Sequence, residues 1–200
     1  HFEIVLLNAS GLQMAVAGQA VAATVTLDTR GQGGFASPQL LAAAAPWRPA
    51  AQMRKLEAIQ RKPGESFRFV AMADSCYHPD VFDTFLKIAA GLQPEFSVDI
   101  GDIVDGEDDP WEWAHFLAQI RRINWPFLVV LGNHDIWPWQ AAPGTNYSPQ
   151  GKLFEELFGP TDYYLDHGDF RFVAIDTARF AISPERLKWL DKALDTSLRK

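Results

Sequence analysis

The feature that most constrains the fold is a strand-and-helix pattern that repeats in the second half of the chain. Short apolar runs at residues 67–73, 96–100 and 126–131 each end in polar residues, and the first two precede segments with apolar side chains at helical spacing. Strands that alternate with helices predict an α/β domain with parallel strands. We therefore expect the three runs to be adjacent central strands of one sheet, flanked by helices.

Later segments predict smaller elements. Residues 152–158 have the pattern of a short helix, and residues 163–165 and 170–175 that of a hairpin. Ser183 as the cap and Pro184 at the first helical position predict a last helix. We expect that helix to turn its leucines inward, namely Leu187, Leu190, Leu194 and Leu198.

The beginning of the chain differs in composition from the rest. Residues 1–51 are poor in charge and rich in Ala, Gly and Gln, with strand-like runs at residues 3–7 and 22–27. Residues 39–51, which contain two prolines, predict a short helix followed by a linker. We interpret residues 1–51 as an N-terminal extension and residues 52–200 as the α/β domain.

Charge and composition argue against some partners. The chain has 25 acidic and 18 basic residues and a net charge of −7, which disfavours a diffuse electrostatic grip on nucleic acid. No apolar stretch approaches the ~18 residues of a membrane span. With the single cysteine Cys76, no intramolecular disulfide can form. We expect a soluble protein, and the sequence leaves open whether it is cytoplasmic or exported.

Three oxygen-bearing side chains follow the three predicted strands. Asp74, Asp102 and Asn133 stand where these strands end, and the carboxyl ends of parallel strands meet at one edge of a sheet. Carboxylate and amide oxygens suit a hard cation, and His134 lies beside the last of them. The arrangement predicts metal-assisted chemistry.

The same residues carry a resemblance to a known family. The sequence D-S-C at 74–76, G-D-I-V-D at 101–105 and G-N-H-D at 132–135 resembles the motifs D-x-H, G-D-x-x-D and G-N-H-[DE] of the calcineurin-like metallophosphoesterases. The resemblance covers the chain from about residue 67 onward. It implies an α/β sandwich of mixed β-sheets flanked by helices, and metal-dependent hydrolysis of a small phosphomonoester or phosphodiester.

The resemblance also implies roles for individual residues. Asp74 would bind the first metal, Asp102 would bridge both metals, and Asn133 would bind the second. His134 would act on the phosphate, with the Asp105 carboxylate orienting its imidazole. The cofactors implied are two divalent or mixed-valence ions of Mn, Fe or Zn.

Two departures from the family pattern bear on these roles. Cys76 stands where the family most often has His, and it is either a thiolate ligand for Zn or Fe or a small buried apolar side chain. His78 is a substitute ligand or a solvated loop residue. The family ends its site with later histidines, whereas His167, in a predicted turn, is the sole histidine after His134. We expect the C-terminal part of the domain to be missing, or the protein to be genuinely reduced.

Two functions remain open at this stage. The first is a metallophosphoesterase, and the alternative is a truncated or inactive relative that keeps the fold and acts as a binding module. The acidic run at residues 105–109 predicts a solvated loop that caps the next helix. Aromatic residues after the third motif either stack on a substrate or cover the edge of the core, namely Trp137, Trp139 and Tyr147.

Overall fold

A four-stranded parallel sheet forms the centre of the molecule. The computed structural model describes residues 3–8, 36–62, 64–76, 78–107, 109–137 and 151–195. Its strands follow one another in chain order across the sheet, each pairing in parallel with the next: β1 (Glu3–Asn8), β2 (Arg68–Ala73), β3 (Phe96–Asp99) and β4 (Phe127–Val129). The prediction of three adjacent central strands is confirmed. The strand expected at residues 22–27 lies outside the described residues.

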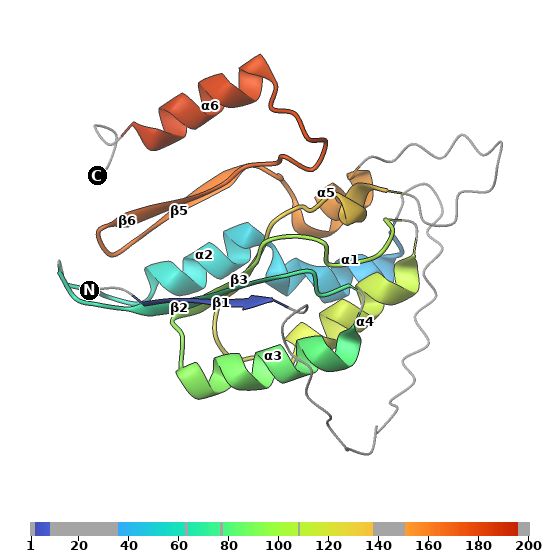
Figure 1. Ribbon diagram of the computed structural model, residues 1–200, viewed down its shortest axis with the longest axis horizontal. Coiled ribbons are helices and arrows are strands. Elements are labelled where there is room, and N and C mark those ends of the chain that lie inside the picture. The colour runs from blue at the N-terminus through green and yellow to red at the C-terminus, as the bar shows by residue number, and fades with distance from the viewer. Residues whose placement is uncertain are drawn as a thin grey trace.

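Helices and a hairpin cover the two faces of this sheet (Figure 1). On one face lie α3 (Pro79–Leu92) and α4 (Pro110–Ile120). On the other lie α2 (Pro49–Glu57) and the antiparallel hairpin of β5 (Tyr163–His167) and β6 (Phe170–Ala174), with α6 (Pro184–Leu194) outside the hairpin. No helix in the described part of the chain is long and apolar enough to cross a membrane.

Side chains of the strands alternate between two cores, as the two-residue period of a strand requires. Val70 of β2 and Val129 of β4 belong to the core on the α3 and α4 side. Phe69 and Leu128, each one residue earlier, belong to the core beneath α2 and the hairpin. Both faces are therefore buried, which explains why β2 and β4 are nearly continuous apolar runs.

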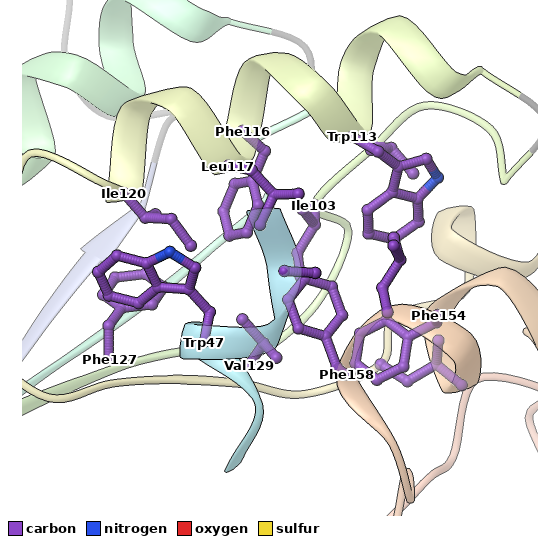
Figure 2. Close-up of a cluster of buried hydrophobic side chains, with 14 of the residues drawn as sticks. Trp47, Ile103, Trp113, Phe116, Leu117, Ile120, Phe127, Val129, Phe154 and Phe158 are labelled. Carbon is purple, nitrogen blue, oxygen red and sulfur yellow. The ribbon is translucent and has the colours of Figure 1, made fainter. Parts of the chain in front are cut away.

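The larger core joins α4 to segments far away in the sequence (Figure 2). Trp113 of α4 is fully buried, and its ring lies 6.1 to 6.3 Å from Phe158 and Phe154 of α5 (Lys152–Phe158). Trp47 of the short helix η2 (Ala45–Trp47) is buried in the same core. Residues on both sides of position 51 thus share one core, while the division into extension and domain stays a prediction.

The outer edge of β4 is covered by two side chains. Buried Gln52 of α2 accepts a hydrogen bond from the main-chain N–H of Phe127 over 3.1 Å. The Tyr163 hydroxyl donates to the carbonyl oxygen of Val129 over 2.8 Å. An unpaired strand edge can pair with a strand of another chain. These two contacts occupy one N–H and one carbonyl group of that edge.

Two predictions about local structure were wrong. The short helix expected in residues 39–51 is present as α1 (Pro38–Ala44), but η2 and α2 stand where the linker was expected. Pro49 begins α2 in its first turn, where the N–H that proline lacks has no helical partner. In α6, Leu187 and Leu194 are exposed, Leu190 is half-buried, and Ala193 is the buried residue. In the described part of the chain, α6 lies on the outer side of the hairpin, away from the central sheet (Figure 1). Leu198 lies outside the described residues.

Candidate active site

The loops that follow β2 and β3 are joined by main-chain hydrogen bonds. The N–H of Asp74 donates to the carbonyl oxygen of Gly101, and the N–H of Cys76 donates to that of Asp102, each over 3.1 Å. The first two motifs are therefore in direct contact at the carboxyl ends of their strands.

The loop after β4 joins them through Asp102. The N–H of His134 donates to Oδ1 of Asp102 over 2.9 Å. Gly132 lies so close to Asp102 that a Cβ atom at this position would overlap its main chain and carboxylate. Only glycine permits this approach. Asn133, which precedes the short helix η3 (His134–Ile136), is thereby brought beside Asp102.

The backbone is unusual at two of the predicted metal ligands. Asp74 has φ 56° and Asp102 has φ 57°, in the left-handed region that most residues avoid. Asp74 directly follows the end of β2, and Asp102 follows the end of β3 after two intervening residues. The left-handed conformation therefore turns the chain sharply where it leaves each strand. Such strained residues cluster at functional sites.

Asp135 holds two of the motifs together. It is fully buried, and its carboxylate accepts hydrogen bonds from the N–H groups of Gly132, Ile103 and Val104 over 2.7, 2.8 and 3.1 Å. Burial raises the pKa of Asp135 to about 7, against the lowering effect of these hydrogen bonds. Sequence reasoning assigned it no role, although its place at the end of the third motif was the available signal.

The His134 ring lies against the loop of the second motif. Its Nδ1 atom is 3.3 Å from the main-chain carbonyl oxygen of Asp105. That contact uses the main chain of Asp105, so orientation of the ring by the Asp105 carboxylate stays a prediction. Oδ1 of Asp105 is buried and has no hydrogen-bond partner among the described residues. The exposed Trp137 ring lies 5.8 Å from that of His134, while Trp139 and Tyr147 lie outside the described residues.

A second buried carboxyl group lies behind the site. Asp99, the last residue of β3, is fully buried, and its Oδ1 atom accepts a hydrogen bond from the N–H of Gly101 over 3.3 Å. Burial, and next the charge of Asp135, raise the pKa of Asp99 well above its ordinary value. Sequence reasoning missed this residue because it counted residues 96–100 as an apolar strand.

The Cys76 thiol is buried beside carboxylates. Burial raises its pKa, and the charges of Asp105, Asp102 and Asp135 raise it further. Without a cation nearby the group is therefore a protonated thiol. Its ligation of a metal stays a prediction, because a metal ion would have to displace the proton.

Glu107 corrects the picture of a solvated acidic loop. It is fully buried, and its carboxylate accepts hydrogen bonds from the N–H groups of Gly151 and Leu153 over 2.9 and 2.8 Å, at the start of α5. Asp109 caps α4 as predicted, accepting from Trp111 N over 2.9 Å. The carboxylate of Glu107 thus satisfies donors that the N-terminus of a helix leaves unpaired.

The remaining histidines lie away from the strand ends. His167 is buried at the other end of the sheet, where its Nε2 atom lies 2.7 Å from Oε2 of Glu95, the residue before β3. His78 is an exposed residue before α3, and His115 stacks on Trp111 in α4.

The donor set at the strand ends suits a hard cation. Asp74, Asp102 and Asn133 are half-buried, and the unpaired oxygen of Asp105 adds an acceptor. Among the residues that the structure describes, no three His, Cys, Asp or Glu side chains are already grouped to hold a metal ion. The oxygen donors present fit a divalent cation that takes part of its coordination from water.

Comparison with known proteins agrees with this geometry. The family model of the calcineurin-like phosphoesterases matches residues 67–197. The chain belongs to this family. Among solved structures, the purple acid phosphatase from yellow lupin (Lupinus luteus) seeds matches with a TM-score of 0.51 and 22% identity. That match covers 68% of this chain and 29% of the lupin protein, so this calcineurin-like phosphoesterase spans less than a third of its length and shares its fold. A search of curated proteins finds no match.

Proposed function

We propose that this chain hydrolyses a small phosphomonoester or phosphodiester, using divalent metal ions at the carboxyl ends of β2, β3 and β4. The observation that carries the proposal is the hydrogen bond from His134 N to Oδ1 of Asp102, which sets the predicted bridging ligand directly beside the predicted catalytic histidine. Membership of a phosphoesterase family supports the reaction class.

Three residues would hold the ions: Asp74 the first, Asp102 both, and Asn133 the second. A pair of bound cations of Mn, Fe or Zn supplies charge stabilisation for an in-line displacement and a water of lowered pKa. The side chains must then place the phosphate between these ligands and His134. Cys76 is a further candidate ligand, and it favours Zn or Fe over Mn.

His134 would act on the phosphate itself. An Nδ1–H that donates to the Asp105 carbonyl oxygen would fix the orientation of the ring. From that position the imidazole stabilises charge on the phosphate, or passes a proton to the departing ester oxygen.

A metal titration tests the proposal. The purified chain is incubated with Mn²⁺, Zn²⁺ or Fe²⁺ and assayed on a chromogenic aryl phosphate monoester and on a diester. We expect metal-dependent turnover that His134→Ala lowers about a hundredfold or more and the exposed His78→Ala leaves unchanged. Turnover that persists in His134→Ala, or that needs no metal, would contradict the assignment.

The second candidate function is a binding module without catalysis. One observation favours it: in the described residues, no three His, Cys, Asp or Glu side chains lie close enough together to hold a metal ion. It predicts that the chain binds at most one divalent ion, weakly, and turns over neither ester. Calorimetric titration with each metal, run beside the assay, distinguishes the two functions.

A further inference from the structure

A cavity of about 280 Å³ adjoins the candidate site. It lies between the loop after β2 and the helix α4. The site side is lined by Ser75, Cys76 and Asp105, and the helix side by Trp111, His115 and Phe116. Because Cys76 and Asp105 also belong to the candidate site, a molecule whose phosphate lies at the strand ends would extend its other part into this cavity.

Trp111 gives the cavity an aromatic wall that packing does not explain. Trp111 is 62% exposed, more than any other tryptophan in the part of the chain that the structure describes. Its ring stacks on His115 with centroids 5.1 Å apart and planes inclined by 29°. A planar group in the cavity would cover apolar surface that the chain leaves to water.

The cavity wall includes a hydrogen-bond acceptor. Asp105 lines the cavity and is half-buried, so its carboxylate lies at the boundary between the candidate site and the cavity. An acceptor at the wall of a cavity favours a ligand that supplies a hydrogen-bond donor. The Asp105 carboxylate can only accept, which favours an amino or hydroxyl group on the ligand over a carboxylate.

The volume limits what the cavity can hold. Pockets for whole drug-sized ligands begin at roughly 300 Å³. A cavity of about 280 Å³ suits a single ring system better than a whole dinucleotide or a peptide.

We propose that the cavity receives the leaving group of the phosphoester, and that this leaving group is a planar aromatic alcohol with an amino or hydroxyl donor. Trp111 stacks on the ring and Asp105 accepts from the donor, so Trp111 determines specificity. The assignment rests on the proposed function for its phosphoester part. In that reaction water adds to phosphorus, the bond to the aryl oxygen breaks, and this oxygen leaves with a proton.

Binding of the free alcohol tests the cavity without catalysis. The probe is 4-aminophenol, with cyclohexanol as the non-planar control, titrated into metal-free protein and followed by NMR saturation transfer. We expect 4-aminophenol to bind more tightly than cyclohexanol. Trp111→Ala should weaken its binding about fivefold or more, because ring stacking on an aromatic side chain is lost. Trp111→Phe should restore most of the affinity.

Controls separate the cavity from general effects. Phe180→Ala removes another exposed aromatic ring, in the segment between β6 and α6, and should leave binding unchanged. Because Trp111 is exposed, its substitution should not unfold the chain, which circular dichroism verifies. Equal binding of 4-aminophenol by the parent chain and Trp111→Ala, or no binding at all, would overturn the proposal.

An activity measurement distinguishes this inference from the proposed function. With metal present, Trp111→Ala should raise KM for 4-aminophenyl phosphate and leave KM for methyl phosphate unchanged. Equal effects on both esters would contradict a leaving-group cavity. Turnover of neither ester, with 4-aminophenol binding intact, would refute the proposed function and leave an aromatic-binding cavity.

Discussion

The N–H of His134 donates to Oδ1 of Asp102 at a distance of 2.9 Å. This one hydrogen bond joins the loop of the third motif to that of the second. It employs one carboxylate oxygen of Asp102, Oδ1. Under the proposed function the carboxylate has two separable tasks, one in loop structure and one in metal binding.

Substitutions at the two residues should separate these tasks. Asp102→Ala removes both the hydrogen-bond acceptor and the charge, so we expect the bound metal to be lost. Asp102→Asn keeps an acceptor for His134 N–H and should preserve stability while weakening metal binding. His134→Ala should lower turnover and leave metal content nearly unchanged, because in the proposed function the ring acts on the phosphate and not on the metal. Elemental analysis after dialysis checks all three, and equal metal content in Asp102→Ala would count against the bridging role.

Asp135→Ala should be among the most destabilising single changes in the chain. It leaves the N–H groups of Gly132, Ile103 and Val104 without their acceptor in a buried setting. We expect a loss of about 3 kcal/mol or more in the free energy of unfolding. Urea denaturation measures it, with the exposed Asp191→Ala as a matched control that should change little.

Glu107→Ala should loosen α5. The change removes the acceptor of Gly151 and Leu153 N–H and leaves a cavity between the acidic loop and the helix. We expect a loss of about 2 to 4 kcal/mol. Glu57→Ala, at an exposed end of α2, should cost less than about 0.5 kcal/mol. Similar midpoints of urea denaturation for the two variants would show that α5 does not need Glu107.

Metal-free protein should lose stability as the pH rises. Burial raises the pKa of Asp135 from 3.8 to about 7, so between these values the folded chain holds a proton that the unfolded chain has released. The associated stability is complete below pH 3.8 and is lost by pH 7, on the order of 4 kcal/mol in all. Asp99, whose pKa burial also raises, acts in the same direction. Unfolding free energies measured across this range should fall with pH, and fall less in Asp135→Asn.

The Cys76 thiol should react slowly in the folded, metal-free chain. Burial and the neighbouring carboxylates raise its pKa, so little thiolate exists at neutral pH. We expect the thiol reagent DTNB to react at least tenfold more slowly with folded than with urea-unfolded protein. If Cys76 ligates a metal, added Co²⁺ should produce a thiolate charge-transfer band that Cys76→Ser abolishes. Fast reaction of the folded chain would contradict the buried thiol.

The central sheet and the meeting of the three motif loops could be predicted from the sequence. Each strand is a local apolar run, and each motif follows it directly, so neighbours in the sequence contain the information. Parallel pairing then brings the loops together without further input.

Other features depend on partners that local patterns do not reveal. Glu107 is buried because it meets Gly151, 44 residues later, and nothing in the acidic run indicates that contact. Asp99 occupies a strand position where an apolar residue is the ordinary expectation. The leucines of α6 follow helical spacing, yet none of the described residues buries Leu187 and Leu194.

The left-handed backbone at Asp74 and Asp102 also bears on how this family diverges. At Asp74, glycine or asparagine would occupy the left-handed conformation with less strain. At Asp102, asparagine would do so and would also keep an acceptor for the N–H of His134, whereas glycine would lose it. Relatives that lose the proposed chemistry should therefore drift to glycine or asparagine at the first turn and to asparagine at the second.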